Sequence, residues 1–429
     1  MRDVVEIRRD DREKCKALYF MMFAIGLLLL VRDAFGVSVN KYIILAVVAV
    51  ATFAFPIEKV VYFIAFLMPL YVGIPGNYLT LVFLVRFLGE THRVHFNSRG
   101  IICCVLAGGY AFVDALVHDN TEIAQLVFFP SMVLVMLIYS LRVPYNKNRL
   151  VLCYSLGVAA LGLIMLISTL QVYDLMDLLT SATRLGDDAT SFAEEGVMNV
   201  SVDPNFYGMF AIAAISTGVE VISNTRALAK AERVFMLIAL CVCVVVALIG
   251  LSRAFFLMIF VWGMLYALSR KKAKTLLLFA IVAIIAGVAV YMFMPEVLDA
   301  IFSRWSEDNV SDGGGRISMM ESYYTYWRGN AHTILFGMGI FDCYVHCTPL
   351  QVIFGGGIVF AILFTIFVGT LVPKNRRKRK MPFLQKWLPM AATVLMSATV
   401  PALMLLNYIY PLVLVGQYSK EEDFTSLEK

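Results

Sequence analysis

The sequence predicts an all-α protein: a polytopic bundle of 12 to 14 transmembrane helices forming one membrane domain over residues 1–429. Of these 429 residues 60% are hydrophobic and 16% are charged, whereas soluble domains are closer to half apolar and a quarter charged. The apolar residues stand in long runs, and Leu150 to Ser168, Val234 to Leu251 and Thr275 to Pro295 carry no charged residue. About twenty apolar residues cross the bilayer as a helix, and these runs lack the alternation of barrel strands.

Hydropathy places thirteen candidate spans along the chain. In order they are 17–31, 41–55, 59–73, 77–89, 100–117, 122–141, 150–171, 204–222, 234–250, 254–268, 275–294, 348–371 and 387–411. The first span follows a charged N-terminus without a clear cleavage site, so we expect a retained helix rather than a signal peptide. Spans 59–73 and 77–89 are short, and a re-entrant hairpin is the alternative there. For the last span the alternative is two helices, separated at Pro401 or Pro411.

The basic residues predict the orientation. With the N-terminus in the cytoplasm, most of the 36 Lys and Arg residues fall in cytoplasmic segments, as the positive-inside rule requires. The run from Lys374 to Lys380 is then an inside anchor rather than a nucleic-acid patch. This orientation puts two long loops outside the membrane, 172–203 and 295–347.

The first outside loop ends in a possible helix start, and a second outside turn carries an arginine. Asp203-Pro204-Asn205 is typical of a turn and helix start, so Asn205 either belongs to a cap or lines an outward-facing cavity. Arg253 lies in a very short hairpin between two spans. A cation there either pairs with an anion, such as the phosphate of a ligand, or reaches outward to headgroups.

The second outside loop supplies further candidates. It contains Arg304, Arg316 and Arg328, and its glycines at 313–315 precede a helix predicted over 317–328. That helix carries four aromatic residues, Tyr323, Tyr324, Tyr326 and Trp327, which suit a membrane interface or stacking on sugar rings. His346 follows at the mouth of the next span, where it is either a general base for a hydroxyl or a hydrogen-bonded structural histidine.

Two cysteines beside His346 raise the question of a metal. Cys343, His346 and Cys347 have no fourth ligand at a regular spacing, so we predict no metal site and no cofactor. A disulfide between Cys343 and Cys347 is an alternative outside the cell, although positions i and i+4 of a helix suit it poorly.

The order of these motifs resembles the O-antigen ligase and O-antigen (capsular polysaccharide) polymerase family, of the Wzy and WaaL type. The residues that carry the resemblance are Asp203-Pro204-Asn205-Phe206, Leu251-Ser252-Arg253-Ala254, Gly315-Arg316, Trp327, Phe336-Gly337-Met338-Gly339, His346, Leu350-Gln351 and Gly355-Gly356-Gly357-Ile358. They cover roughly residues 200 to 370. The family often has Asn directly after the histidine and Tyr soon after it, where this chain has Cys347 and Pro349.

The resemblance implies a GT-C-like fold and an inverting, metal-independent glycosyltransferase in the inner (plasma) membrane of a bacterial cell. The donor would be an undecaprenyl-pyrophosphate-linked oligosaccharide in the membrane lipid. Arg253 and Arg316 would stabilise the departing pyrophosphate, and His346 would accept the proton of the acceptor hydroxyl. The residues proposed to bind substrate are Asn205, Arg304, Arg328 and Trp327.

Several functions stay open at this point. A polymerase is favoured over an O-antigen ligase because the chain has no motif specific for lipid A core. The rival from another class is a transporter or flippase, which would place charges at mid-span in broken helices; a non-catalytic assembly partner is a third option. A chain-length regulator and a separate flippase are the expected protein partners, and we expect no nucleic acid.

Overall fold

A computed structural model describes residues 2–94, 97–118, 127–141, 146–175, 185, 202–223, 228–250, 252–269, 292, 296, 316–371, 383–399 and 406–418. These parts are helical, apart from turns and one isolated β-bridge between Val94 and Leu141. The first eight elements are α1 (Arg2–Phe35), α2 (Lys41–Ala54), α3 (Ile57–Leu67), η1 (Pro69–Gly73), α4 (Gly76–Leu88), η2 (Thr91–Arg93), α5 (Ser98–Val117) and α7 (Phe128–Ser140). The others are α8 (Lys147–Leu170), α10 (Pro204–Ser223), α11 (Lys230–Ile249), α12 (Arg253–Ser269), α15 (Arg316–Trp327), α16 (Ala331–Phe336), α17 (Thr348–Leu371), α18 (Phe383–Ser397) and α19 (Leu406–Tyr418).

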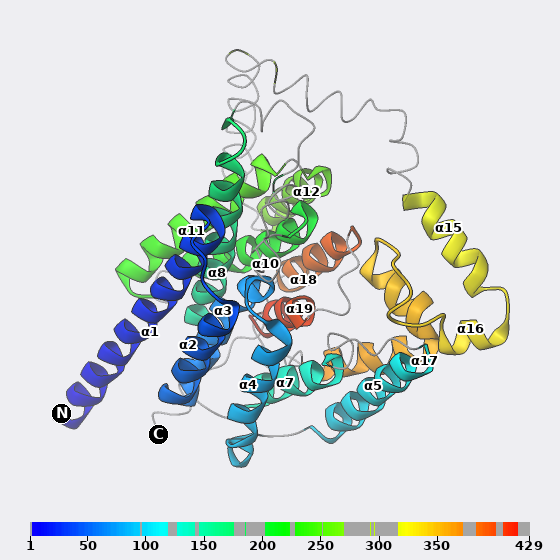
Figure 1. The fold of residues 1–429 in the computed structure, drawn as a ribbon, viewed down its shortest axis with the longest axis horizontal. Coiled ribbons are helices and arrows are strands. Elements are labelled where there is room, and N and C mark those ends of the chain that lie inside the picture. The colour runs from blue at the N-terminus through cyan, green and yellow to red at the C-terminus, as the bar shows by residue number, and fades with distance from the viewer. Residues whose placement is uncertain are drawn as a thin grey trace.

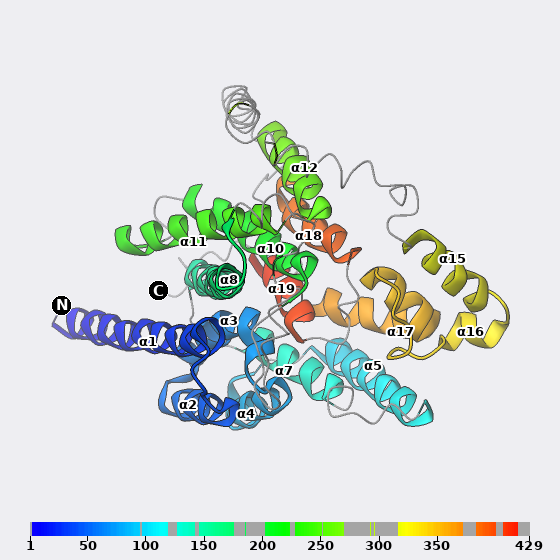
Figure 2. The ribbon, with the colours of Figure 1, turned by 45° about the horizontal axis from the view of Figure 1, so that its top comes forward.

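Six of the described helices are long and apolar enough to cross a membrane: α1 from Cys15, α5, α8, α10, α11 and α17. Shorter apolar helices accompany them, among them α2, α4 and α7. By length and composition these helices are those of a multi-pass membrane protein. This is the fold class that hydropathy predicts. In Figures 1 and 2, α1 and α2 lie at one side of the molecule, and α15, α16 and the outer part of α17 lie at the other.

Two predicted spans differ from the helices observed. The segment 387–411 is not one helix, because α18 ends at Ser397 and α19 begins at Leu406. The segment 59–73 is the 11-residue α3 followed by η1. Span 275–294 lies outside the described residues apart from Met292, as do the basic run 374–380 and most of the loop 172–203.

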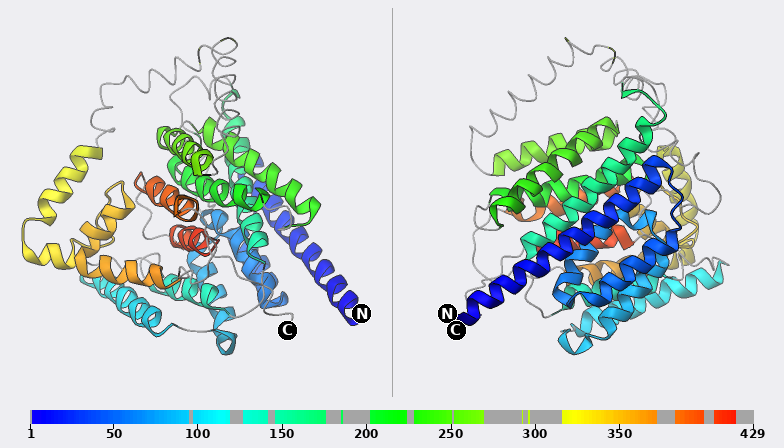
Figure 3. Two further views of the ribbon diagram at one scale, coloured as in Figure 1. Left: turned by 180° about the vertical axis from the view of Figure 1, so that it is seen from behind. Right: turned by 60° about the vertical axis from the view of Figure 1, so that its left-hand side comes forward.

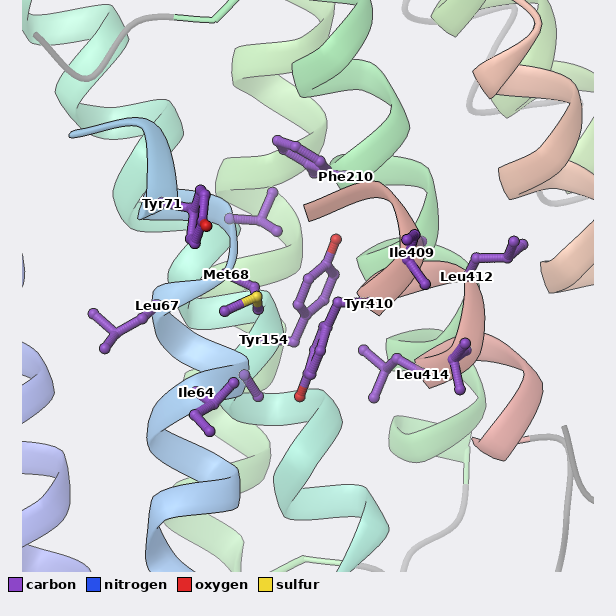
Figure 4. Close-up of a cluster of buried hydrophobic side chains, with 14 of the residues drawn as sticks. Ile64, Leu67, Met68, Tyr71, Tyr154, Phe210, Ile409, Tyr410, Leu412 and Leu414 are labelled. Atoms are coloured by element: carbon purple, nitrogen blue, oxygen red, sulfur yellow. The ribbon is translucent and has the colours of Figure 1, made fainter. Parts of the chain in front are cut away.

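α3 is a short helix that its neighbours in the bundle enclose. Ten of its 11 residues are buried, all except Glu58, and a helix that is apolar on every face is typical of a protein interior. It packs on α8 and α1. Figure 4 shows Met68, the residue directly after α3, next to Tyr154 of α8 and Tyr410 of α19, whereas Leu67 points away from both tyrosines. The core thus joins segments from both ends of the sequence.

α17 is the one described helix with a non-helical residue recorded inside it. Gly357 has φ 69° and ψ 178°, so the helix is broken at the Gly355-Gly356-Gly357 run. The freed carbonyls accept backbone bonds from the turn after α16, since Met338 N donates to Phe354 O at 3.0 Å and Gly339 N donates to Gly355 O at 3.1 Å. Figure 3 shows α16 and this turn beside the bend of α17. The predicted loop 295–347 therefore contains folded structure from Arg316 onward.

Candidate functional site

The residues that the sequence analysis singled out stand at the starts of four helices. Asp203 precedes α10, Ser252 precedes α12, Arg316 is the first residue of α15, and His346 stands two residues before α17. Unsatisfied N–H groups and the helix dipole make such ends favourable to negative charge. The contacts described next bring these helix starts together.

The starts of α10 and α12 are joined by side chains. Asp203 Oδ1 accepts the backbone N–H of Asn205 at 2.7 Å, which caps α10. Ser252 Oγ accepts the backbone N–H of Phe255 at 3.2 Å, which caps α12. The same Ser252 hydroxyl donates to Asn205 Oδ1 at 2.7 Å. Asn205 is therefore part of a fixed joint between the two helix starts.

His346 lies within electrostatic reach of two charged residues from other elements. Its half-buried imidazole has a pKa below the ordinary value, first because burial disfavours the charged ring, and next because the Arg316 guanidinium repels it. The Asp203 carboxylate acts in the opposite direction. The fold thus gathers Asp203, Arg316 and His346, which are up to 143 residues apart in sequence, around one place.

α15 is held beside His346 by one apolar face. Met320, Tyr323 and Trp327 lie at helical spacing and pack against a small buried cluster whose four members are Cys343, Val345, Cys347 and Phe354. The Tyr323 hydroxyl also accepts the backbone N–H of Tyr344 at 3.3 Å. This packing fixes the helix that begins with Arg316 along the segment that carries His346.

The other predicted site residues are placed less centrally. Trp327 packs on Phe354, with ring centroids 5.4 Å apart, and its buried indole nitrogen has no hydrogen-bond partner among the described residues. The Arg328 guanidinium stacks over Tyr324 at 5.2 Å from the ring centroid. At 1.5 Å per helical residue, the far end of α15 is roughly 16 Å from Arg316. Trp327 and Arg328 therefore cannot share one phosphate with Arg316.

Two predicted arginines are not placed by side-chain contacts. The backbone of Arg253 begins α12, directly after the Asn205–Ser252 joint, while its side chain lies outside the described part of the structure. Arg304 lies wholly outside the described residues.

The cysteines beside His346 are buried free thiols. Burial raises the pKa of the Cys343 thiol to about 11 and also raises that of Cys347. Both therefore stay protonated near neutral pH, the form that is neither a good nucleophile nor a good metal ligand. Across the described residues, no group of three or more His, Cys, Asp and Glu side chains gathers as a metal site would require.

Sequence reasoning passed over two residues that the structure brings into the site region. Ser252 was quoted in a motif but given no role, although a Ser three residues before Phe255 is a recognisable cap signal. Asp114 has no predicted role. It is 8% exposed near the C-terminal end of α5, and its Oδ2 accepts the backbone N–H of Ile340 at 2.7 Å. Nothing in the local sequence predicts this contact across 226 residues.

The assembled geometry suits chemistry on an anionic ligand with a hydroxyl nearby. Arg316 and adjoining helix starts supply positive potential. A half-buried imidazole that is neutral at pH 7 supplies a proton acceptor. Comparison with known proteins adds no family to this picture, because no protein-family model and no curated protein matches the chain.

Proposed function

We propose that this chain is a surface-polysaccharide polymerase, an inverting glycosyltransferase of the O-antigen or capsule type in the inner membrane of a bacterium. It would transfer undecaprenyl-pyrophosphate-linked glycan to a sugar hydroxyl of an acceptor at the outer face. The observation that carries the proposal is that His346 lies within electrostatic reach of Arg316 and of Asp203, which caps the helix of the Asn205–Ser252 joint. Its four contributing segments are the ones whose motifs resemble that family.

The arrangement supports a division of roles. Arg316, with Arg253 at the start of α12, would hold the pyrophosphate and stabilise the charge that develops on it as the glycosidic bond breaks. His346 would take the proton of the attacking hydroxyl, and its lowered pKa keeps it in the base form at neutral pH. Asp203 would favour the imidazolium once the proton has arrived. Asn205, fixed by Ser252, would border the site.

The broken helix α17 is a feature that would also suit a transporter or flippase, because broken helices commonly build transport sites. In this chain, however, carbonyls at the break accept backbone N–H groups of Met338 and Gly339, so they are not open to a permeating ion. This occupation favours surface chemistry over transport. An O-antigen ligase uses the same donor and differs in its acceptor, so it stays the alternative within the class.

A complementation experiment tests the proposal. The gene is deleted in its parent strain and restored as wild type, His346→Ala, Arg316→Ala or Arg253→Ala at matched membrane levels, and surface glycan is separated on a gel. Val113→Ala, a change on the exposed face of α5, is the matched control. If the chain is a polymerase, we expect the deletion strain to carry only single repeat units. Wild type and the control should restore the ladder of glycan lengths, and the three site variants should not.

Other outcomes point elsewhere. Long undecaprenyl-linked chains that never reach lipid A would identify a ligase. Site variants that restore a full ladder would remove His346 and the arginines from the mechanism. A deletion that leaves the glycan unchanged would remove the enzyme function itself and favour the transporter.

A further inference from the structure

The segment that carries His346 is anchored at one end by α5. After α16 the chain turns through Gly337 and Gly339, passes the buried Ile340 and Phe341, and runs through Cys343 and Val345 to His346. Two side chains of α5 reach this turn. The Tyr110 hydroxyl donates to Phe336 O, and Asp114 Oδ2 accepts from Ile340 N at 2.7 Å.

The Asp114 bond is well placed to set the position of the turn. Ile340 is fully buried, so without Asp114 its N–H would lack an acceptor in an apolar surrounding, which is costly. A charged acceptor strengthens the bond that is formed. His118 Nδ1 lies 3.5 Å from Asp114 Oδ1, and Asp342 also acts on the carboxylate electrostatically, so the anchor is a small charged cluster at the end of α5.

The same turn is locked from its other side by the break in α17. Its amides at Met338 and Gly339 bond to Phe354 O and Gly355 O. A Cβ atom at Gly337 would lie 1.9 Å from Gly355 O, so there is no space for a side chain between the turn and α17. The turn from Phe336 to Ile340 is therefore held between the anchor on α5 and the break in α17.

We propose that Asp114 is a positioning residue, which holds the turn at 337–340 and thereby fixes the His346 segment relative to Arg316 and Asp203. The effect of Asp114 on catalysis rests on the proposed function, whereas its effect on the position of the turn does not. Asp114 touches neither His346 nor Arg316 in any recorded contact. Its effect passes through Ile340 and the segment that follows.

Hydrogen exchange tests the structural part directly. Amide exchange of the full chain in detergent is followed by mass spectrometry for wild type, Asp114→Ala, Asp114→Asn, Tyr110→Phe and the control Val113→Ala. Asp114→Ala is expected to speed exchange in peptides covering 337–347, with peptides of α8 unchanged. Asp114→Asn keeps an oxygen acceptor for Ile340 and is expected to recover most of the protection. Unchanged exchange at 337–347 in both Asp114→Ala and Tyr110→Phe would overturn the proposal.

Turnover with purified lipid-linked repeat units tests the catalytic part. Because small misplacement of a catalytic group costs on the order of 100-fold in rate, Asp114→Ala is expected to lower kcat by about that factor while KM for the donor stays within about twofold. Asp114→Asn is expected to restore most of kcat. Full turnover in an Asp114→Ala protein with loosened 337–347 would overturn the positioning role.

Failure of the proposed function can be told apart from failure of this inference. If wild type transfers no glycan, the proposed function fails, while the exchange data and the rate at which diethylpyrocarbonate modifies His346 still decide whether Asp114 holds the segment. If Asp114→Ala does not fold, Asp114→Leu, which keeps the bulk of the side chain but removes the acceptor of Ile340 N, and Tyr110→Phe supply the comparison. Unchanged His346 modification in both, with unchanged exchange, would overturn the inference.

Discussion

At the scale of single residues, His346 is the group whose chemistry depends most on its neighbours. Burial and Arg316 lower its pKa, and Asp203 opposes them. Removal of the Arg316 charge removes a repulsion of the imidazolium, so the pKa of His346 rises. Removal of the Asp203 charge removes an attraction, so the pKa falls. The two changes therefore shift the titration of one residue in opposite directions.

The pH profile of kcat/KM measures this effect. We expect Arg316→Gln to move the acid limb to higher pH and Asp203→Asn to move it to lower pH, with Arg316→Lys as the control that keeps the charge. Arg316→Gln is also expected to lower the rate roughly 100- to 1,000-fold through loss of transition-state stabilisation. Acid limbs that do not move in either variant would mean that His346 is not the titrating base.

The joint between Asn205 and Ser252 gives a second prediction at this scale. Because the 2.7 Å hydrogen bond links two helix starts, a double-mutant cycle of Asn205→Ala and Ser252→Ala is expected to show coupling of about 1 kcal/mol in the free energy of unfolding. Thermal unfolding with a thiol-reactive dye is a suitable measurement, since seven of the eight cysteines are buried. Additive effects would show that the two helix starts are held by other contacts.

At the scale of elements, the break in α17 and the turn after α16 are one unit. A Cβ at Gly337 would lie 1.9 Å from Gly355 O, and one at Gly357 would lie 2.4 Å from Leu335 O. Both glycines also have positive φ angles, which disfavour any side chain. Glycine is therefore required at these positions for two independent reasons.

Alanine substitutions separate this requirement from a general effect on α17. Gly337→Ala and Gly357→Ala are each expected to cost more than about 3 kcal/mol of stability, since both strain the backbone and force a clash. Gly369→Ala lies on the same helix with open space around its Cβ position, and it is expected to be neutral or slightly stabilising. Equal unfolding temperatures for Gly337→Ala and Gly369→Ala would contradict the close fit.

At the scale of the whole molecule, a polar cluster ties the N-terminal helix to the centre of the bundle. Glu232 of α11 accepts from Arg149 Nε of α8 at 2.8 Å and from the Tyr19 hydroxyl of α1 at 2.9 Å. Near these groups, Lys59 Nζ of α3 donates to Cys15 Sγ at 3.1 Å. Four helices thus meet at charged groups in an otherwise apolar interior.

Loss of Glu232 removes the 2.8 Å ion pair between its carboxylate and Arg149 Nε. We expect Glu232→Ala to lower stability by roughly 3 kcal/mol, the low end for breaking a buried ion pair, because both side chains keep slight exposure. Glu321→Ala, on the exposed face of α15, is the control. An unfolding temperature that stays at the wild-type value would mean that apolar packing alone holds these helices.

The orientation of the chain is a further prediction at this scale. In a Cys241→Ala background, which removes the one exposed cysteine, Tyr344→Cys and His92→Cys each place a thiol at an exposed position. We expect a membrane-impermeant maleimide to label Tyr344→Cys in spheroplasts, and to label His92→Cys only after lysis. The reverse pattern would invert the topology that the basic residues predict.

The sequence by itself determined the helical membrane class. Charge-free runs as long as those of α8 and α11 can satisfy their backbone in a bilayer only as helices, and this holds whatever surrounds them. Local signals also set several helix ends: Pro204 begins α10, and the predicted helix 317–328 is α15 to within a residue. Such features depend on neighbours a few residues away, which the sequence displays directly.

Tertiary structure decided what hydropathy could not distinguish. The apolar segment that starts at Ile57 forms an 11-residue helix that neighbouring helices enclose, and hydropathy alone does not show this burial. The meeting of Asp203, Arg316 and His346, and the bond from Ile340 to Asp114, join residues 30 to 226 positions apart. An apolar residue has the same hydropathy against lipid as against another helix, so only the packed bundle shows which charged groups meet.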